Sequence, residues 1–598
     1  MAHGYISPKG ALEMEDVGNN ICDELVLRSL LQYDSRDADE KTLIMHDLVR
    51  DLAQSIMENK IPGVQVQRAN VSSASDHSKI RELNLSGTQI RTLPDSLCRL
   101  WNLQVLNLDD CEKLEALPKK TRDLINLRHL FLEDCESLTE MPSKIGELTS
   151  LRTLSQFIVG RNRGNRLEEL QCLKLGGKLT IRHLERVENL MDAKKANLAE
   201  KENLLHLNLQ WESDNDAPTL EEKESEEKVF EALEPHPNLE ILWVWGFNGR
   251  HFPDWMSNST LEKLVDVHIS SCKNFLHLPQ LGELPHLKYL WVTTAEEVEY
   301  IIEDPLISVR QFPSLKTLYL WSLPNLKGFL KEQVTNKSVE AFSNLEELRI
   351  EDCSSLKVVP SSLKKLKKLK CTSSNLALLS NLENLTKLDM YFEESTSVET
   401  KYAVTTETLR SQTNLKILNI SNADELSLPE QGLRALKSLT NLYIVNCNSL
   451  PRVWFVHFTA LEELGIYGCP EVVELPQEIK NLNNCLKTVI LSDLPHMVCV
   501  PKALQHVSDS LQYLYLFGLP QLRSLPGWLG DLRCLEDLSI HDCLKIASIP
   551  DSIRGMTKLR YLSVQEFPEL ERRCEREKGE DWHKIAHIAH LQIGEWIP

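Results

Sequence analysis

The sequence predicts an α/β solenoid built from short parallel strands, and three observations lead to this fold class. First, residues 103–108 follow the spacing Leu-x-x-Leu-x-Leu, in which apolar Leu106 and Leu108 flank polar Asn107 with the period of two of a β-strand. Second, the pattern returns in residues 127–132, about 24 residues later, within the period of leucine-rich repeats. Third, one short strand cannot bury its apolar face alone, so each copy needs a neighbour on either side. We therefore expect a leucine-rich-repeat solenoid, a horseshoe of short parallel strands.

The repeat array is expected to fill residues 80–570 with about 20 repeats, because an array grows in one dimension without adding separate cores. Most spacings between neighbouring copies are 22–25 residues. The middle apolar residues of the expected strands are Leu83, Leu106, Leu130, Leu154, Leu179, Leu207, Leu242, Val267, Leu290, Leu318, Leu348, Leu369, Leu388, Leu418, Leu442, Leu464, Val489, Leu514, Leu538 and Leu562.

Both ends of the chain depart from this repeat. In residues 1–59, two segments (20–32 and 43–57) carry apolar residues with a helical period, which predicts short helices. Residues 60–79 contain Pro62-Gly63 and several serines, as is typical of a linker. In residues 571–598, the apolar side chains of Trp582, Ile585, Ala586 and Ala589 predict an amphipathic helix that caps the array.

One long gap separates Leu207 from Leu242 and holds an acidic stretch at residues 212–227. A run of like charges is typical of a solvated segment. We therefore expect a loop that leaves the array on the side opposite the strands.

Composition limits the classes of function. The chain has 598 residues, of which 42% are hydrophobic, so it can bury a core. Its net charge of −20 argues against nucleic acid as a partner, because phosphate binding needs a basic surface. No apolar run approaches the roughly 18 residues of a membrane helix, and the first residues lack the pattern of a secretory signal. We expect a cytoplasmic protein with no membrane insertion.

Cysteine usage agrees with a reducing compartment. Fifteen cysteines are too few, in a chain of this length, for a disulfide scaffold. Seven of them share one repeat position, three residues after the last strand residue. At this position a cysteine acts as a small buried hydrophobe with a weak donor for the turning backbone. These residues are Cys111, Cys135, Cys272, Cys353, Cys447, Cys469 and Cys543.

Signals for catalysis are weak. The segment Gly176-Gly177-Lys178-Leu179-Thr180 lacks the glycine spacing and the hydroxyl residue after the lysine that a phosphate loop needs. His583, His587 and His590 share a helical face, but Lys584 stands where a zinc protease would carry its glutamate. We expect no catalytic residues, no metal site and no enzymatic activity.

The strands are more informative, because the residues beside the middle leucine point away from the core onto the concave face. Several neighbouring strands carry aromatic residues there, and exposed aromatic residues are typical of protein-binding hot spots. The alternative is that the rings stack on one another or are covered by the acidic insertion. The first cluster is Trp243, Trp245, Tyr289, Trp291, Tyr319 and Trp321, with His268 among them, and the second is Tyr513, Tyr515 and Phe517.

Four stretches carry a resemblance to a known family: residues 1–10, Met45-His46-Asp47-Leu48-Val49-Arg50-Asp51-Leu52-Ala53, the Cys-x-x-Leu-x-x-Leu-Pro form of the repeats, and residues 574–585. Together they resemble plant intracellular disease-resistance receptors of the nucleotide-binding, leucine-rich-repeat type, coiled-coil subclass. The resemblance implies that residues 1–59 are the end of a winged-helix subdomain, an all-α remnant. It also implies that Met45, His46 and Asp47 sense the nucleotide, with His46 facing the phosphates of ADP.

The same resemblance implies that the chain begins inside the winged-helix region, as a C-terminal fragment, a truncated gene product or a partial gene model would. We expect no cofactor in this chain, and ADP or ATP binding only in the full-length family member. The resemblance implies a recognition and autoinhibition module of plant innate immunity, which binds a pathogen effector or a guarded host protein on the concave face. One alternative is an intramolecular regulator whose ligand is the missing nucleotide-binding domain. An extracellular repeat receptor is disfavoured by the absence of a signal and of a membrane helix.

Overall fold

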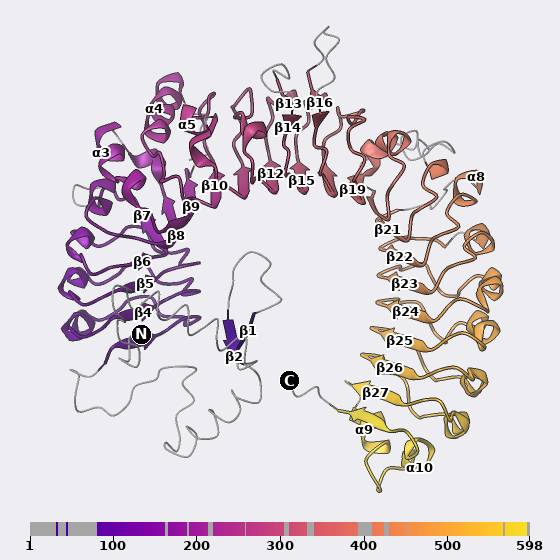
Figure 1. Ribbon diagram of the computed structural model, residues 1–598. Helices are drawn as coiled ribbons and strands as arrows, with labels where there is room; N and C mark the ends of the chain where they lie inside the picture. The colour runs from indigo at the N-terminus through magenta and orange to yellow at the C-terminus, as the bar shows by residue number, and fades with distance from the viewer. Residues whose placement is uncertain are drawn as a thin grey trace. The chain divides into compact units, whose positions relative to one another are not determined.

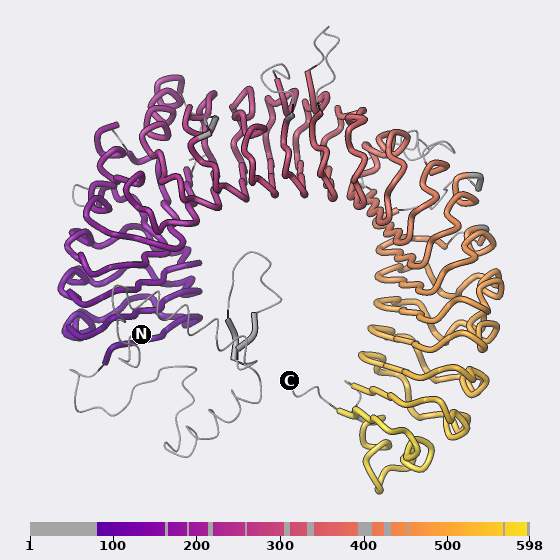
Figure 2. Tube along the Cα trace, in the orientation of Figure 1, coloured from indigo at the N-terminus to yellow at the C-terminus, as the bar shows by residue number. Residues whose placement is uncertain are grey.

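The computed structural model describes residues 31–33, 43–45, 80–161, 165–187, 190–212, 219–257, 259–303, 310–331, 340–392, 409–423, 430–450, 452–565 and 568–594. The chain forms two compact units, Met1–Gly246 and Phe247–Pro598. In each unit, short strands lie on the inner side of the winding chain, and turns and short helices lie on the outer side (Figure 1). Figure 2 shows the successive coils of the chain, and most coils contribute one strand.

The first unit carries parallel strands in chain order. They are β3 (Glu82–Asn84), β4 (Val105–Asn107), β5 (His129–Phe131) and β6 (Thr153–Leu154), followed by β7 (Gln156–Ile158), β8 (Gly177–Arg182), β9 (Leu204–Gln210) and β10 (Ile241–Trp245).

The second unit continues the pattern with one long parallel ladder. Its strands are β11 (Asp266–Ser270), β12 (Tyr289–Thr293), β15 (Thr317–Trp321), β18 (Glu347–Glu351), β19 (Lys368–Thr372), β20 (Lys387–Tyr391), β21 (Ile417–Ser421), β22 (Asn441–Val445), β23 (Glu463–Tyr467), β24 (Thr488–Ser492), β25 (Tyr513–Phe517), β26 (Asp537–His541), β27 (Tyr561–Gln565) and β28 (His590–Ile593). Two small pairs lie outside the ladder, β13 (Tyr300–Ile302) with β16 (Gly328–Leu330) and β14 (Arg310–Gln311) with β17 (Glu340–Ala341).

The predicted register is confirmed within each unit, because the middle apolar residues of neighbouring strands pair directly. Leu106 pairs with Leu130 in the first unit, and Leu348 pairs with Leu369 in the second. Leu154 and Leu179 are an exception. The chain bends at Ser155, and the next strand, β7, pairs with β8. Phe157 of β7, rather than Leu154, therefore lies opposite β8, where it pairs with Ile181.

The repeat core is apolar and closed to solvent. Leu130, Leu132 and Cys135 have 0% of their surface exposed, which confirms their prediction as core residues. After the strand, Asp134 adopts a left-handed backbone (φ 53°) that turns the chain, and Cys135 points back inward. Its Sγ donates to the carbonyl of Leu108 at 3.1 Å, one repeat earlier. Burial raises the pKa of the Cys135 thiol to about 12, so the group stays protonated and can keep donating.

The outer side consists of short helical segments. The α-helices are α3 (Leu190–Lys195), α4 (Leu220–Glu231), α5 (Asp254–Ser257), α8 (Glu430–Leu433), α9 (Pro568–Arg573) and α10 (Trp582–Ile585). The 3-10 helices are η2 (Asp95–Arg99), η3 (Thr121–Asp123), η4 (Ile145–Glu147), η5 (Leu167–Leu170), η6 (Leu184–Arg186), η7 (Leu198–Glu200), η8 (Ser259–Leu261), η9 (Leu281–Glu283), η10 (Ser373–Asn381), η11 (Arg452–Val456), η12 (Gln477–Leu482), η13 (Lys502–Val507), η14 (Gly527–Asp531) and η15 (Asp551–Gly555). Several follow a Leu-Pro or Ile-Pro step, because proline fits the start of a helix, where no donor is needed.

The acidic insertion is not simply a loop, and that prediction was wrong for its second half. Residues 220–231 form α4, whose first turn is held by a capping box between Thr219 and Glu222. On the inner side of this helix, Phe230 is buried against Trp211, with 5.1 Å between the ring centroids. Capping and this apolar anchor outweigh the repulsion among the glutamates.

Near the N-terminus, residues 31–33 and 43–45 form strands β1 (Leu31–Tyr33) and β2 (Leu43–Met45), which pair antiparallel. The helices predicted across these positions, and with them an all-α remnant, are therefore wrong at these residues. A three-residue apolar run such as Leu43-Ile44-Met45 fits a strand as well as a helix, so periodicity alone could not separate them.

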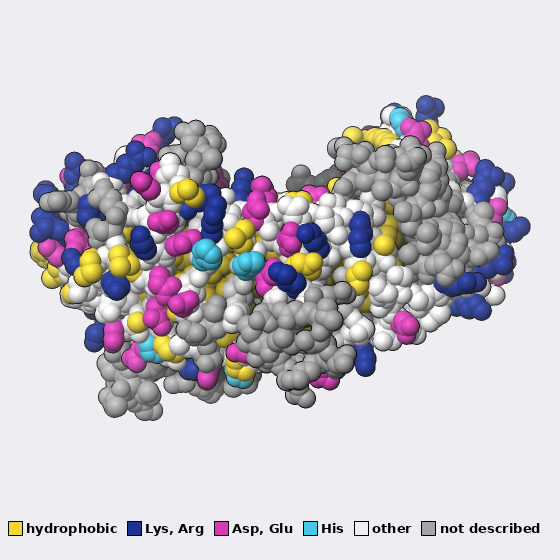
Figure 3. Space-filling view, turned by 90° about the horizontal axis from the view of Figure 1, so that it is seen from above, with side chains coloured by type: hydrophobic (Ala, Val, Ile, Leu, Met, Phe, Trp, Pro, Cys, Tyr) yellow, Lys and Arg dark blue, Asp and Glu magenta, His cyan; other side chains and the backbone are white. Residues whose placement is uncertain are grey.

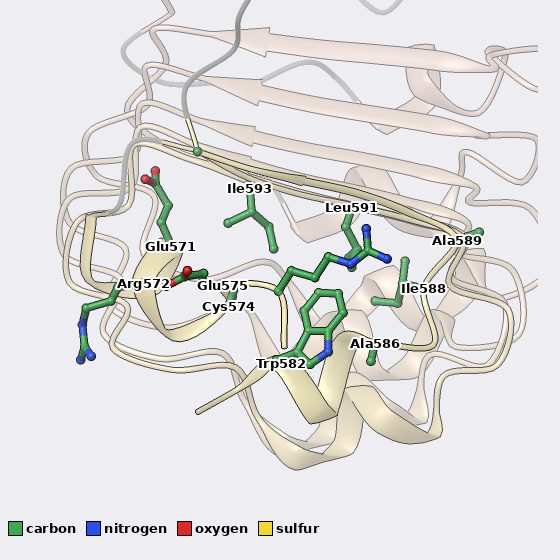
Figure 4. A pocket seen from close by; sticks show the side chains of 12 residues that line it. Glu571, Arg572, Cys574, Glu575, Trp582, Ala586, Ile588, Ala589, Leu591 and Ile593 are labelled. Atoms are coloured by element: carbon green, nitrogen blue, oxygen red, sulfur yellow. The ribbon is translucent and has the colours of Figure 1, made fainter. Parts of the chain in front are cut away.

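The C-terminal cap also differs from the single amphipathic helix predicted from the spacing of Trp582, Ile585, Ala586 and Ala589. Helix α10 is only four residues long, and the ladder ends in β28, which pairs parallel with β27 and places Leu591 opposite Leu562. The alternation of Leu591, Gln592 and Ile593 has the strand period, which overrides the helical spacing before it. Trp582, Leu591 and Ile593 line a cavity of about 730 Å³ at this end of the second unit (Figure 4).

Candidate partner-binding surface

The candidate surface consists of the side chains at the first, third and fifth positions of the five-residue strands, which we call the strand face. In β10 the residues between them, Leu242 and Val244, are buried, whereas Trp243 is half-buried and Trp245 is 43% exposed. The alternation follows from the pleat of a strand. The aromatic residues of both predicted clusters therefore lie on the strand face.

In the first unit, Trp243 is packed by polar neighbours from the preceding strands. The ring of His206 meets it edge-on at 4.7 Å between centroids, and Lys178 Nζ lies 5.9 Å from its ring centroid. The prediction that Trp243 is exposed is therefore wrong, because these neighbours cover part of its ring. Trp245 stays open and lines a cavity of about 420 Å³ together with Arg182, Gln210 and Glu212.

In the second unit, four aromatic residues form a continuous set that we call the aromatic row: Tyr289, Trp291, Tyr319 and Trp321. Direct pairing between β12 and β15 places Trp291 opposite Tyr319, and their ring centroids are 4.8 Å apart in an edge-on arrangement. His268 of β11 stacks on the other side of Trp291 at 5.1 Å.

The prediction that Trp291 is exposed is also wrong, because stacking leaves its side chain half-buried. The rings do stack on one another, as the alternative interpretation held, but only at the centre of the row. At its edges Tyr289 is 38% exposed and Trp321 is 44% exposed. The row therefore combines a packed centre with two accessible aromatic side chains.

A band of paired charges borders the aromatic row on β18 to β20. Arg349 lies 5.8 Å from the ring centroid of Trp291, and its Nη2 is 2.6 Å from Glu347 Oε1. The next cation, Lys370, is 3.0 Å from Glu351. Burial alone would raise the pKa of Glu347, but the hydrogen bond and charge of Arg349 outweigh it and lower this pKa. Opposite charges thus largely satisfy one another in this band.

The second predicted cluster lies on β25, where Tyr513, Tyr515 and Phe517 are all half-buried. The ring of Phe517 stacks on Tyr515 at 5.9 Å and lies 4.9 Å from His541. The hydroxyl of Tyr515 donates to Asp537 Oδ2 at 3.4 Å. Burial, followed by the nearby carboxylate of Asp537, raises the pKa of Tyr515 to about 12.

Sequence analysis missed the part of this surface on β22 and β23. Tyr443 donates its hydroxyl to Glu463 Oε1 at 2.8 Å, and the ring centroids of Tyr443 and Tyr467 are 6.5 Å apart. Gly465 lies between them, opposite Tyr443 in the ladder. Each strand holds only one tyrosine, so neither strand attracts attention alone. Aligning the strands in register would have placed the two rings together.

The predicted nucleotide-sensing residues cannot be located in the same way. His46 and Asp47 lie outside the described residues, and Met45 is the last residue of β2. Within the described part of the chain, no cluster of three or more His, Cys, Asp or Glu side chains is arranged to hold a metal ion.

Other faces have a different character. On the face shown in Figure 3, acidic and basic side chains are mixed and hydrophobic ones are scattered. Among the residues that the structure describes, no helix has the length and apolar character needed to cross a bilayer.

Three family models match parts of the chain. A disease resistance protein winged-helix domain matches residues 1–53, the R13L1/DRL21 leucine-rich repeats match residues 167–295, and the leucine-rich repeats of RPS2-like plant disease resistance proteins match residues 250–375.

Similar proteins carry the same description. RGA4 of Solanum bulbocastanum, named a disease resistance protein, is 35% identical over 99% of this chain and 56% of its own length. Disease resistance protein RGA2 of Solanum bulbocastanum is 38% identical over 71% of this chain and 46% of its own length. The chain thus spans about half the length of these relatives. Among solved structures, a leucine-rich-repeat protein of Leptospira interrogans shares 20% identity over 81% of this chain and 96% of its own, with a TM-score of 0.35.

Proposed function

This chain is a homologue of plant disease resistance proteins of the nucleotide-binding, leucine-rich-repeat class, and from that premise we propose that its strand face is the recognition surface of a plant immune receptor. The partner is a protein, either a pathogen effector or a guarded host protein, and binding takes place in the cytoplasm. Nucleic acid, membrane insertion and catalysis form no part of the proposal.

The observation that carries the proposal is the aromatic row of the second unit. Tyr289 and Trp321 are large, exposed aromatic side chains, and the packed rings of Trp291 and Tyr319 lie between them. Rigid aromatic side chains contribute much of the energy of protein interfaces because they bury a large area with few rotatable bonds. Neighbouring rings also fix their orientation before a partner arrives, which lowers the entropy lost on binding.

The proposal is tested with the double variant Tyr289→Ala, Trp321→Ala in the full-length receptor that contains this chain. We expect the defence response to a recognised effector to disappear, and the affinity of the purified chain for that effector to fall at least about tenfold. The matched control is Trp101→Ala, Val358→Ala, which removes two exposed apolar side chains outside the strand face. Equal affinity of the double variant and the control would contradict the proposal.

The alternative partner is the nucleotide-binding domain of the same receptor, and the match of residues 1–53 to a disease resistance winged-helix model supports this alternative. A pull-down with that domain added as a separate polypeptide distinguishes the two. If it binds the strand face and no effector does, the chain is an intramolecular regulator.

We also propose that the chain by itself binds neither ADP nor ATP measurably. A phosphate site needs backbone donors from a glycine-rich loop, together with a lysine or a metal, to offset the desolvation of the anion. Of the residues that the resemblance assigns to nucleotide sensing, His46 is the one that faces the phosphates, and an unperturbed imidazole is mostly uncharged at neutral pH. Calorimetry with ADP should show no heat of binding, and measurable binding would refute the argument. In the full-length receptor, His46→Ala should loosen ADP and favour the active state.

A further inference from the structure

The outward residues of strands β22 to β26 differ in charge from those of β18 to β20, where lysine and arginine occupy outward positions. They include five tyrosine or phenylalanine residues and two carboxylates, and no lysine or arginine occupies a first, third or fifth position in these strands. We call this set the acidic tyrosine face: Tyr443, Glu463, Gly465, Tyr467, Tyr515, Phe517 and Asp537.

Both carboxylates are held in place by neutral donors. Glu463 accepts from the hydroxyl of Tyr443 at 2.8 Å and from Asn441 Nδ2 at 2.9 Å. Asp537 accepts from Ser539 Oγ at 3.0 Å and from the hydroxyl of Tyr515 at 3.4 Å. Among the described residues, neither forms an ion pair with a lysine or an arginine, and each ionised carboxylate has acceptor sites beyond the two in use.

The centre of this face is kept open by a glycine. A Cβ atom on Gly465 would lie 2.6 Å from the ring of Tyr467 and 2.7 Å from the ring of Tyr443, closer than such contacts allow. The absence of a side chain therefore lets both rings lie over the strand, beside Glu463. A planar cation could stack on one of these rings while it hydrogen-bonds to the carboxylate.

The spacing of the carboxylates defines what length of partner fits. Glu463 and Asp537 are the first residues of β23 and β26, and direct pairing through Thr488 and Tyr513 places them in one row across the ladder. Neighbouring strands are about 4.8 Å apart, so three steps separate the two carboxylates by about 14 Å. An extended chain covers this distance in about four residues, at roughly 3.4 Å each.

We propose that the acidic tyrosine face docks an extended protein segment that carries two arginines about four residues apart. This inference rests on the proposed function and names the chemistry of the partner at one part of the strand face. Arginine fits better than lysine, because its flat guanidinium stacks on tyrosine and bonds a carboxylate through two parallel N–H groups. Charge complementarity selects the occupant, since the face offers two oriented carboxylates and no resident cation on its outward positions.

The test uses the purified chain and three fluorescent nine-residue peptides with a Gly/Ser background and two variable positions, third and seventh. The positions carry Arg in the first peptide, Lys in the second and Glu in the third. Fluorescence anisotropy at physiological ionic strength should show the tightest binding for the Arg peptide, weaker binding for the Lys peptide and none for the Glu peptide. Equal binding of all three, or no binding of the Arg peptide, would overturn the proposal.

A pair of isosteric variants separates docking from general attraction to an acidic protein. The double variant Glu463→Gln, Asp537→Asn should weaken binding of the Arg peptide at least about tenfold. The control variant Glu471→Gln, Glu474→Gln removes the same charge from exposed positions that follow β23, outside the strand face. It should weaken binding of the Arg peptide less than about twofold. Equal losses would show only non-specific attraction. Self-association of the chain that is abolished by the first pair would assign the face to a second copy and also overturn the proposal.

The outcome can be told apart from failure of the proposed function. If an effector binds, and its affinity falls in Tyr289→Ala, Trp321→Ala but not in Glu463→Gln, Asp537→Asn, the proposed function stands and this inference fails.

Discussion

The aromatic row and the acidic tyrosine face are built on the same repeat, yet their environments are opposite. Around the row, Arg349 and Lys370 pair with Glu347 and Glu351, and Trp291 packs against His268. On the acidic tyrosine face, the hydroxyl groups of Tyr443 and Tyr515 take the place of those cations. The comparison shows that the leucine positions determine the scaffold, whereas the residues between them determine separately whether a patch satisfies its own charges or leaves them for a partner.

The largest expected effect tests whether the two regions share one scaffold. Leu290 lies under the aromatic row and Leu514 under the second cluster, and both have 0% of their surface exposed. Leu290→Ala and Leu514→Ala should each lower the free energy of unfolding by about 2–5 kcal/mol, because each leaves a cavity in the core. Urea denaturation with hydrogen exchange measures this. A loss at only one position would show that the repeats are not equivalent.

Salt should then separate the regions. Binding of the Arg peptide to the acidic tyrosine face is expected to weaken several-fold between about 0.05 and 0.5 M salt, because the Debye length shrinks from roughly 14 to 4 Å. Binding of an effector through Tyr289 and Trp321 should change much less, because burial of apolar surface carries it. Titrations of both at several salt concentrations provide the measurement, and identical salt slopes would remove the distinction.

A smaller effect concerns pH. Burial raises the pKa of Asp537, so the ionised carboxylate is disfavoured in the folded state. This group therefore lowers the stability of the fold as the pH rises from its ordinary pKa through its folded pKa. Glu347 has a lowered pKa, so it contributes stability above its ordinary pKa that is lost as pH falls through the folded pKa. NMR titration of the carboxyl groups should show that the pKa values of Asp537 and Glu347 are shifted in opposite directions. In the Arg349→Met variant, the pKa of Glu347 should rise. Shifts in the same direction would contradict the comparison.

The smallest effect is expected from the paired charges themselves. Lys370→Met breaks the ion pair with Glu351 at the surface and should change the free energy of unfolding by no more than about 1 kcal/mol, because exposed ion pairs are screened by solvent. Thermal denaturation of this variant beside Leu290→Ala would establish the order of the two effects. A loss comparable with that of Leu290→Ala would mean that the charged band is part of the structural core.

The scaffold could be predicted because the buried apolar positions recur at a regular spacing along the sequence. Even Leu369 and Leu388, which are unusually close in sequence, pair directly in the ladder. Short segments were harder to assign. Residues 43–45 and 580–593 carry mixed periods. The loop predicted from the charge of the acidic stretch did not take the capping box of Thr219 and Glu222 into account.

The candidate site could be predicted only as a set of positions. The alternation of each strand places Trp291 and Tyr515 on the strand face, but their burial depends on side chains from other repeats, such as His268 and Asp537. The pairing of Lys370 with Glu351 likewise depends on neighbours across the ladder. Such contacts depend on rotamers and on the register between strands, which spacing within one repeat does not contain.

The central claim is that the strand face of the second unit receives a protein partner. Hydroxyl-radical footprinting of the chain with and without a bound effector tests it most directly, because oxidation reports the exposure of each tyrosine and tryptophan. We predict that Tyr289 and Trp321 lose reactivity in the complex, while Trp101, which is 59% exposed outside the strand face, keeps its own. Protection of Trp101 with unchanged oxidation of Tyr289 and Trp321 would contradict the claim.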